Sequence, residues 1–397
     1  KKTWPELEYE LGLVEPSLIV NDGIDYGCRP DIEAAYGDKL RPMDAFKDSA
    51  PAELVDCVGH DDLMVLMFTS GTTGRSKAVM LSERNFFTTV ECQVKFGDAM
   101  LDYKHEHMPE DKNDVLSNFA ILPLFHLGTF ICLFVWACKG WALNLSADIR
   151  DFYRDLGLMH SDIMASAPML VETVYNDMKR GRVSRLNGLW DLCCSSAALD
   201  PRMLLELAQN GFVVNQCYGM TETFGDGILN FTQVEKHMSA VGKPDDHVQY
   251  KLDETGEICI RGGCVMLGYY KDPEATAEVI DADGWFHTGD LARMDEEGFY
   301  YITGRKKNLI ILDSGENVSP EELESLLAKC PAVKECVVKE KGKKICAVVY
   351  CDADRQQAVR DFITEVNRTL PLYKRMTAVE FAAEPLPRNA MGKLLRK

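Results

Sequence analysis

Short apolar runs, separated by polar turns, divide the middle of the chain into alternating strands and helices. The apolar run at 63–68 lies between Asp61-Asp62 and a Thr/Ser/Gly cluster, so it predicts a buried strand. Ser82 is placed to cap a helix over 82–91. Strands are expected at 119–124, 162–166, 189–194 and 213–216, and helices at 127–138, 169–179 and 201–209. This alternation predicts an α/β domain with a largely parallel sheet.

The pattern differs on both sides of this block. Residues 1–60 contain Asp-Gly, Tyr-Gly and repeated prolines, so we expect them to be loop-rich. From Val241 onward, short strands at 250–252, 257–261 and 298–303 between Gly-rich turns predict a small β subdomain. Ser319-Pro320-Glu321-Glu322 is a capping box that starts a helix at 321–329. Strands at 333–340, 344–351 and 377–382 and a helix at 356–369 follow.

These patterns predict an α/β protein with two domains. Residues 1–304 would form a large α/β core with the small β subdomain, and residues 305–397 a small α+β domain. Charge follows the same division. Residues 305–397 hold 18 Lys and Arg against 13 Asp and Glu, a net charge of +5, which leaves −23 on the rest. A basic C-terminal domain next to an acidic core domain suggests that the two domains have different functions.

Composition and charge exclude several classes of protein. The 397 residues carry a net charge of −18, which argues against a nucleic-acid binder and against attachment to an anionic membrane. The apolar run at 127–138 is shorter than the roughly 20 residues of a transmembrane helix. The chain opens on Lys1-Lys2 and a polar stretch rather than an apolar leader. Its 14 cysteines are scattered, so we expect reduced thiols in a cytoplasmic protein.

The strongest chemical signal is a polar loop directly after the first predicted strand. Its sequence is Thr69-Ser70-Gly71-Thr72-Thr73-Gly74-Arg75-Ser76-Lys77. Glycines let backbone N–H groups approach one anion, hydroxyl groups add donors, and Lys77 adds a mobile charge. The spacing is not that of a Walker loop. By composition alone, a polar surface turn remains the alternative.

This loop resembles the phosphate-binding signature of the acyl-adenylate-forming (AMP-binding) superfamily. Four further segments match that superfamily's motifs in order and spacing. They are Tyr218-Gly219-Met220-Thr221-Glu222, Gly268-Tyr269-Tyr270 with Thr288-Gly289-Asp290, Gly304-Arg305-Lys306-Lys307, and Pro387-Arg388-Asn389-Ala390-Met391-Gly392-Lys393. The resemblance covers nearly the whole chain and is closest to AMP-forming acyl-CoA synthetases of the long-chain fatty acid–CoA ligase type. It implies a ligase of fatty acid metabolism whose mobile C-terminal domain swings about a hinge at Lys307.

The resemblance implies ATP, Mg²⁺ and coenzyme A as cofactors or co-substrates, and a small carboxylic acid as substrate. The acid would attack the α-phosphorus of ATP, and a thiol would then take the acyl group. Both reactants of the first step are anions, so the protein must supply positive charge and alignment. The residues that would hold the β and γ phosphates are Thr69, Ser70, Gly71, Thr72, Thr73, Gly74 and Lys77.

The same resemblance assigns the remaining roles. Lys393 would bridge the carboxylate and the α-phosphate, Thr221 would donate to the α-phosphate, and Glu222 would hold Mg²⁺. Tyr218, followed by Gly219, would stack on adenine. Ser196 and Ala197 would line the edge of adenine. Asp290, with Arg305 nearby, would accept the ribose hydroxyls. Gly315 would line the thiol channel.

The acid itself is indicated by the segment Leu122-Pro123-Leu124-Phe125-His126, which resembles the aromatic–His element of acyl- and aryl-CoA ligases. Members that activate amino acids usually carry an Asp there, and this stretch has none. A plain, apolar carboxylic acid is therefore favoured. A core histidine remains the alternative for His126. The apolar run that follows could line a tunnel or form a core helix.

Some features depart from the superfamily pattern. Ser76 replaces the usual Pro, Ala78 the usual Gly, and Met391 a small polar residue. Only 68 residues precede Thr69, so we expect part of the N-terminal subdomain to be truncated. A nucleotide-binding remnant without activity is therefore one alternative, and an enzyme that loads an acyl carrier protein is another. The joint presence of Lys77, Glu222, Asp290, Arg305 and Lys393 favours an active ligase.

Overall fold

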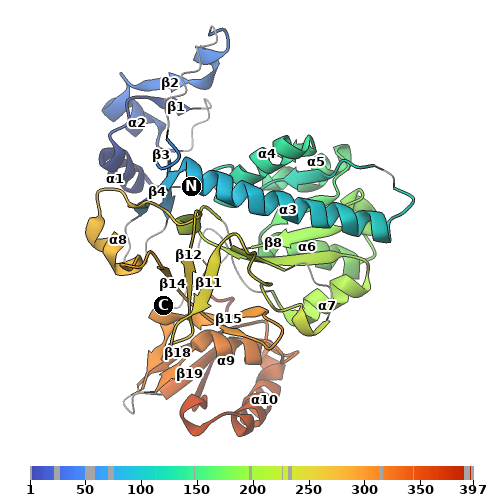
Figure 1. Cartoon of the computed structure of the whole chain (residues 1–397). Coiled ribbons are helices and arrows are strands. Elements are labelled where there is room, and N and C mark those ends of the chain that lie inside the picture. The colour runs from blue at the N-terminus through green and yellow to red at the C-terminus, as the bar shows by residue number, and fades with distance from the viewer. Residues whose placement is uncertain are drawn as a thin grey trace. The chain divides into compact units, whose positions relative to one another are not determined.

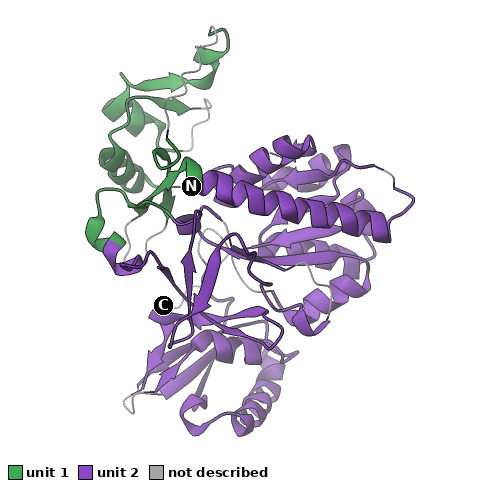
Figure 2. Cartoon of the chain, viewed as in Figure 1, with its two compact units in different colours: residues 1–84, 266–276 green, residues 85–265, 277–397 purple. Residues whose placement is uncertain are grey.

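The computed structural model describes most of the chain (Figure 1). The described residues are 2–21, 27–49, 59–69, 76–111, 113–146, 148–195, 199–225, 227–230, 235–312, 316–342, 344–388 and 394. Contacts divide the chain into two compact units, one of residues 1–84 and 266–276, the other of residues 85–265 and 277–397 (Figure 2).

The first unit opens with helices where the sequence predicts loops, so that prediction is wrong. α1 (Trp4–Val14) and α2 (Arg29–Tyr36) each carry a proline in their first turn, where the missing N–H costs no hydrogen bond. The backbone N–H of Thr3 also donates to Glu6 Oε2 at 2.6 Å, which caps α1. β1 (Ile19–Asn21) and β2 (Leu40–Pro42) pair in parallel.

An antiparallel sheet completes the first unit. Its order is β13 (Gly268–Tyr269), β4 (Lys77–Ser82) and β3 (Leu63–Thr69). The strand expected at 63–68 is confirmed, but its expected burial is wrong, because β3 lies at the edge and Leu63 and Met64 are exposed. Thr69 pairs with Lys77 in this sheet, so the polar loop connects two neighbouring strands.

The second unit contains the α/β domain that the sequence predicts. Its sheet has the order β10-β9-β8-β7-β5-β6, parallel except for β10. The strands are β5 (Ser117–Ala120), β6 (Ala142–Leu145), β7 (Ile163–Ser166), β8 (Asp191–Cys194), β9 (Val213–Gly219) and β10 (Gly227–Leu229). The helices are α3 (Glu83–His107), α4 (Leu127–Lys139), α5 (Phe152–Leu158), α6 (Pro168–Lys179) and α7 (Pro201–Gln209).

Apolar side chains from both layers form the core of this domain. Phe119, Leu192 and Val214 from the strands pack with Val171 and Leu204 from the helices. β5 ends at Ala120, earlier than expected, because the chain turns at the segment that contains Pro123. The motif Tyr218-Gly219-Met220-Thr221-Glu222 begins at the carboxyl end of β9, the edge of a parallel sheet where ligands usually bind.

A small antiparallel sheet follows, as the sequence predicts. Its order is β11 (Gln249–Leu252), β12 (Glu257–Arg261), β14 (Phe286–Met294) and β15 (Tyr300–Arg305). Ile258, Ile260 and Tyr300 lie in its core. α8 (Pro273–Val279) precedes β14 and crosses the boundary between the two units.

The C-terminal part forms an α+β fold with its own core. β16 (Ile310–Ile311) pairs with β17 (Asn317–Val318), and the Ser319 hydroxyl caps α9 (Pro320–Leu327). β18 (Glu335–Lys341), β19 (Lys344–Tyr350) and β20 (Ala378–Ala382) form a sheet beside α10 (Gln356–Thr369). Val318, Leu323, Val349 and Val359 are buried together. The domain boundary at residue 305 stays a prediction.

Short 3₁₀ helices connect several elements. They are η1 (Met43–Phe46), η2 (Ile149–Asp151), η3 (Val183–Leu186), η4 (Thr221–Thr223), η5 (Glu235–His237), η6 (Lys306–Asn308), η7 (Ala353–Arg355) and η8 (Leu372–Lys374). In the described part of the chain, no helix has the length and apolar character needed to cross a membrane. Every cysteine in that part is free of a disulfide.

Candidate active site

The carboxyl end of β9 carries the first group of candidate residues. Tyr218 and Gly219 are its last residues, and η4 with Thr221 and Glu222 follows directly. The turn closes at Gly225, whose N–H donates to the carbonyl of Met220 at 2.8 Å. Thr221 and Glu222 are half-buried at this turn. In α/β sheets, this edge is where ligands usually bind.

Asp290 lies at the centre of a second group, which comes from three different strands. Tyr218 Oη donates to Asp290 Oδ2 at 3.1 Å, and Arg305 Nε donates to Oδ1 at 2.7 Å. Asp290 on β14 and Arg305 on β15 are partners in the sheet register. Only 5% of Asp290 is exposed. The structure thus brings together three residues that the sequence motifs place 72 and 15 positions apart.

Tyr218 keeps its proton in this arrangement. Burial, and after it the negative charge of Asp290, raise the pKa of Tyr218 well above its ordinary value. The phenol therefore acts as a donor to the carboxylate over the physiological pH range. Its predicted stacking on adenine stays a prediction, whereas its hydroxyl contact with Asp290 is a feature that the sequence motifs do not indicate.

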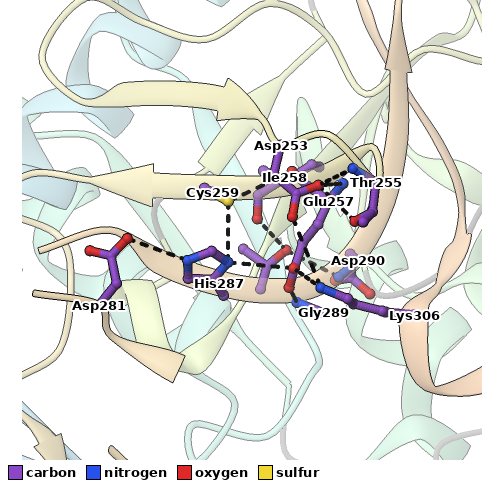
Figure 3. A network of polar contacts seen from close by, with 11 residues as sticks. Asp253, Thr255, Glu257, Ile258, Cys259, Asp281, His287, Gly289, Asp290 and Lys306 are labelled. Carbon is purple, nitrogen blue, oxygen red and sulfur yellow. Dashed lines mark hydrogen bonds and ion pairs between the residues drawn. The ribbon is translucent and has the colours of Figure 1, made fainter. Parts of the chain in front are cut away.

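Glu257 organises the turn that leads to Asp290 (Figure 3). Its carboxylate accepts the Gly289 N–H at 2.7 Å on one oxygen and Lys306 Nζ at 2.7 Å on the other. The Glu257 side chain is 3% exposed, whereas that of Lys306 is 47% exposed. The hydrogen bond to Glu257 raises the pKa of Lys306. One buried carboxylate thus holds both the turn before Asp290 and the residue after Arg305.

His287 lies beside this network and connects to further polar groups. Its Nδ1 lies 3.4 Å from Glu257 Oε2 and 3.5 Å from Cys259 Sγ, and its Nε2 lies 3.5 Å from Asp281 Oδ2 (Figure 3). Burial, with Glu257 and Asp253 nearby, raises the pKa of Cys259 to about 11. Cys259 is therefore a thiol rather than a thiolate at neutral pH.

Asp253, Cys259 and His287 could in principle hold a metal ion, because their ligand atoms all lie within 4.8 Å of one another. However, Lys306 Nζ lies 3.9 Å from Asp253 Oδ2 and 2.7 Å from Glu257 Oε2. The ammonium group already supplies the positive charge between these carboxylates. The arrangement is therefore better suited to positioning the backbone than to binding a cation.

His126 stands at the N-terminus of α4, on the same unit. It is half-buried, and its ring stacks on Phe125 with centroids 5.4 Å apart. Burial lowers the pKa of His126, so the imidazole is neutral at pH 7. A neutral ring can donate or accept a hydrogen bond without adding charge to an apolar pocket.

The candidate phosphate loop belongs to the first unit. Thr69 ends β3 and Lys77 begins β4, so the two ends of the loop lie side by side as a register pair. Lys77 Nζ lies 4.4 Å from the ring centroid of Tyr269, a residue of another sequence motif. The Gly268-Tyr269-Tyr270 motif also belongs to the first unit, whereas His126 and the described candidates from Tyr218 to Glu222 and from Asp290 to Lys307 belong to the second.

Several candidates lie outside the described residues: Ser70, Gly71, Thr72, Thr73, Gly74, Ser196, Ala197, Gly315 and Lys393. Lys307, the expected hinge, is described, and its side chain is exposed on η6.

Sequence reasoning missed Glu257. The available signal was a carboxylate at the head of an otherwise apolar strand, Ile258-Cys259-Ile260, where a charge is costly unless it is paired.

Comparisons with known proteins agree with this geometry. The profile of the AMP-binding enzyme family matches residues 7–270, and that of the AMP-binding enzyme C-terminal domain matches residues 322–393. The fold is similar to that of ATP-bound MatB from Rhodopseudomonas palustris, with a TM-score of 0.80 and 25% identity, over 99% of this chain and 80% of that one.

Two curated relatives extend the comparison. A long-chain-fatty-acid–CoA ligase of Salmonella typhimurium is 32% identical over an alignment of 359 positions that covers 85% of this chain and 61% of that protein. A feruloyl-CoA synthase of an Amycolatopsis species is 32% identical over 420 residues, covering 99% of this chain and 80% of that protein. The chain thus spans less than two thirds of the Salmonella ligase. Both profile matches and both relatives lead to one conclusion: the chain belongs to the AMP-binding enzyme family.

Proposed function

We propose that the protein joins a carboxylic acid to the thiol of coenzyme A in two steps, using ATP and releasing AMP and pyrophosphate. The observation that carries this proposal is the cluster of Tyr218, Asp290 and Arg305, next to the turn with Thr221 and Glu222, in a chain of the AMP-binding family. The cluster presents a nearly buried carboxylate held in one orientation by two donors. Such a carboxylate is suited to accept the two hydroxyl groups of a ribose.

In the first step, a carboxylate oxygen of the acid forms a bond to the α-phosphorus of ATP, and the bond to pyrophosphate breaks. Both partners are anions, so catalysis depends on alignment and on positive charge rather than on a protein nucleophile. Thr221 would donate its hydroxyl to the α-phosphate. Lys77, with the hydroxyl and N–H groups of residues 69–74, would hold the β and γ phosphates.

Glu222 fits the role of a magnesium ligand. It is half-buried on η4, and a carboxylate oxygen is the donor type that Mg²⁺ prefers. Bound there, Mg²⁺ would neutralise charge on the departing pyrophosphate. Tyr218 and Gly219, with Ser196 and Ala197, would form the adenine site.

In the second step, the sulfur of coenzyme A attacks the acyl carbon, AMP leaves, and the thiol proton passes to solvent. We propose that residues 305–397 form a mobile domain that serves the two steps in turn by moving about Lys307. Lys393 would contact the acid and the α-phosphate in the first step. Gly315 would line the thiol channel in the second. The net charge of +5 on this segment would favour its approach to phosphate groups.

The proposed acid is plain and apolar. His126 is neutral and half-buried, and α4, which starts beside it, is rich in apolar residues. No carboxylate occurs in residues 122–126 to pair with an α-amino group. The relatives named above are a long-chain-fatty-acid–CoA ligase and a feruloyl-CoA synthase, which supports aliphatic and aromatic acids as the first candidates.

Acid-dependent exchange of labelled pyrophosphate into ATP tests the proposal. The panel should hold straight-chain fatty acids of graded length, hydroxycinnamic acids and amino acids. We expect exchange with at least one apolar acid and none with amino acids. Lack of exchange with every acid would contradict the proposal and favour the nucleotide-binding remnant. Offering coenzyme A or a carrier protein with a free thiol to the active mixture then identifies the thiol acceptor, because only the correct one yields a thioester.

Lys393→Ala separates the two steps, with Lys344→Ala, an exposed lysine of β19, as the matched control. Lys393→Ala should abolish exchange and largely spare thioester formation from supplied acyl-adenylate. Lys344→Ala should preserve both. Equal loss of both steps in Lys393→Ala would contradict the proposed role of the mobile domain.

A further inference from the structure

Three residues with metal-binding side chains meet on the second unit, and none of them belongs to the motifs discussed above. Cys92 lies on α3, and Asp245 and His247 lie in the loop before β11. One ligand atom from each, a sulfur, a carboxylate oxygen and a ring nitrogen, lies within 4.8 Å of the other two. Two segments more than 150 positions apart in sequence thus present three different donor types to one point.

The side chains are partly to fully shielded from solvent. Cys92 is 3% exposed, and the side chains of His247 and Asp245 are 12% and 29% exposed. His247 Nδ1 lies 3.1 Å from Asp245 Oδ1, and Lys95 Nζ lies 3.3 Å from that same oxygen. Lys95, the His247 N–H and His247 Nδ1 all contact Oδ1 of Asp245, so Oδ2 could serve as the ligand atom.

The geometry is close to that of a tetrahedral metal site. Ligand atoms about 2.0–2.3 Å from a zinc ion lie roughly 3.3–3.8 Å from one another. The observed limit of 4.8 Å therefore requires a contraction of at most about 1.5 Å. Rotations of the three side chains would supply it.

The donor set distinguishes between cations. Sulfur and imidazole nitrogen suit Zn²⁺ and Co²⁺, whereas Mg²⁺ takes oxygen ligands. A Cys92 thiolate and the Asp245 carboxylate would also balance the charge of a divalent ion. This set is better placed for a metal than Asp253, Cys259 and His287, where Lys306 bridges two carboxylates. Lys95 forms an ion pair with Asp245, and its half-exposed side chain can turn to solvent.

A cavity adjoins the three residues and provides the second observation. It has a volume of about 410 Å³, and Cys92 and Asp245 form part of its wall. Phe96, Leu229 and Phe299 also line it. The cavity gives room for a water molecule as a fourth ligand, and it lets an ion reach the buried thiol.

We propose that Cys92, Asp245 and His247 form a binding site for a zinc-type divalent cation that connects α3 to the loop before β11. The three side chains supply sulfur, oxygen and nitrogen, and water from the cavity completes the tetrahedron. Ion binding releases the Cys92 proton to solvent. The site is independent of the proposed ligase activity.

The test is a titration of the full chain with Co²⁺ in the absence of nucleotide. A sulfur-to-cobalt charge-transfer band should appear and saturate at one ion per chain. Zn²⁺ should remove the band by competition, and an excess of Mg²⁺ should not. Absence of the band in the wild-type protein would overturn the proposal.

Variants locate the site. Cys92→Ser and His247→Gln should each weaken Co²⁺ binding at least tenfold, while Cys138→Ser, an exposed cysteine at the end of α4, should bind as the wild type does. Circular dichroism establishes that each variant is folded. If Cys92→Ser does not fold, His247→Gln and Asp245→Asn carry the test. Unchanged binding in the folded variants, or loss of the band in Cys259→Ser instead, would overturn the proposal.

Discussion

Glu257 offers the sharpest test of how the proposed nucleotide site is held in place. We compare Glu257→Ala, which removes the carboxylate, with Glu257→Gln, which keeps an oxygen to accept the Gly289 N–H. The matched control is Glu254→Ala, which removes an exposed carboxylate from the same turn between β11 and β12. All three changes remove one negative charge, so their differences report on contacts.

The magnitude follows from the two main contacts of Glu257. A hydrogen bond from a backbone N–H to a buried carboxylate contributes about 1.5–3 kcal/mol. The ion pair with Lys306 contributes less, about 0.5 kcal/mol, because the lysine side chain is 47% exposed and screened by water. Glu257→Ala should therefore destabilise the ordered turn before Asp290 by about 2–3.5 kcal/mol, which predicts at least a roughly 30-fold loss of affinity for AMP.

Isothermal titration with AMP measures this loss directly. Glu257→Gln retains the acceptor and should bind AMP within about fivefold of the wild type. Glu254→Ala should bind AMP as the wild type does. If Glu257→Ala also bound AMP normally, the turn would not depend on Glu257. Equal losses in the Gln and Ala variants would show that charge, rather than the hydrogen bond to Gly289, is what counts.

Further predictions concern stability and are checked by urea unfolding. Burial raises the pKa of Asp191, so the stability that this carboxyl group contributes should be lost as pH rises above about 4, and Asp191→Asn should gain stability relative to the wild type between about pH 4 and pH 8. Lys104→Met leaves the buried Asp162 carboxylate without its ammonium partner at 3.4 Å and should cost about 3 kcal/mol; a cost below 1 kcal/mol would contradict this. In Gly227→Ala, the new Cβ would lie 1.6 Å from the carbonyl oxygen of Tyr218, so β10 must shift and the free energy of unfolding should fall by more than about 2 kcal/mol. Gly128→Ala, in open space on α4, should stabilise by about 0.5–1 kcal/mol and serves as its control.

Local signals were sufficient for many elements of the fold. α7 (Pro201–Gln209) and α10 (Gln356–Thr369) begin and end where the sequence predicts. Asp200 accepts a hydrogen bond from the Arg202 N–H, and Pro201 occupies the first turn of α7, so its start is encoded within three residues. The same proline signal misled in α1 and α2, because a proline in a first helical turn and a proline in a loop look alike without the contacts that follow.

The site was only partly accessible to sequence reasoning. Motifs identified Tyr218, Asp290 and Arg305, but the hydrogen bond between Tyr218 and Asp290 depends on how β9 and β14 lie in space. Glu257 acts on Gly289 and Lys306, 32 and 49 positions away, and no local pattern records such distances. The burial of β3 was mispredicted because an apolar run does not show whether its strand lies at the edge or the centre of a sheet.

The central claim is that a carboxylate attacks the α-phosphorus of ATP. The most direct measurement uses the acid that gives the strongest pyrophosphate exchange, labelled with ¹⁸O in its carboxylate, in the presence of coenzyme A. Mass spectrometry of the products should find one ¹⁸O atom in AMP and none in pyrophosphate, because the oxygen that bonds to phosphorus leaves with AMP. Label in pyrophosphate, or AMP free of label while thioester forms, would contradict the account.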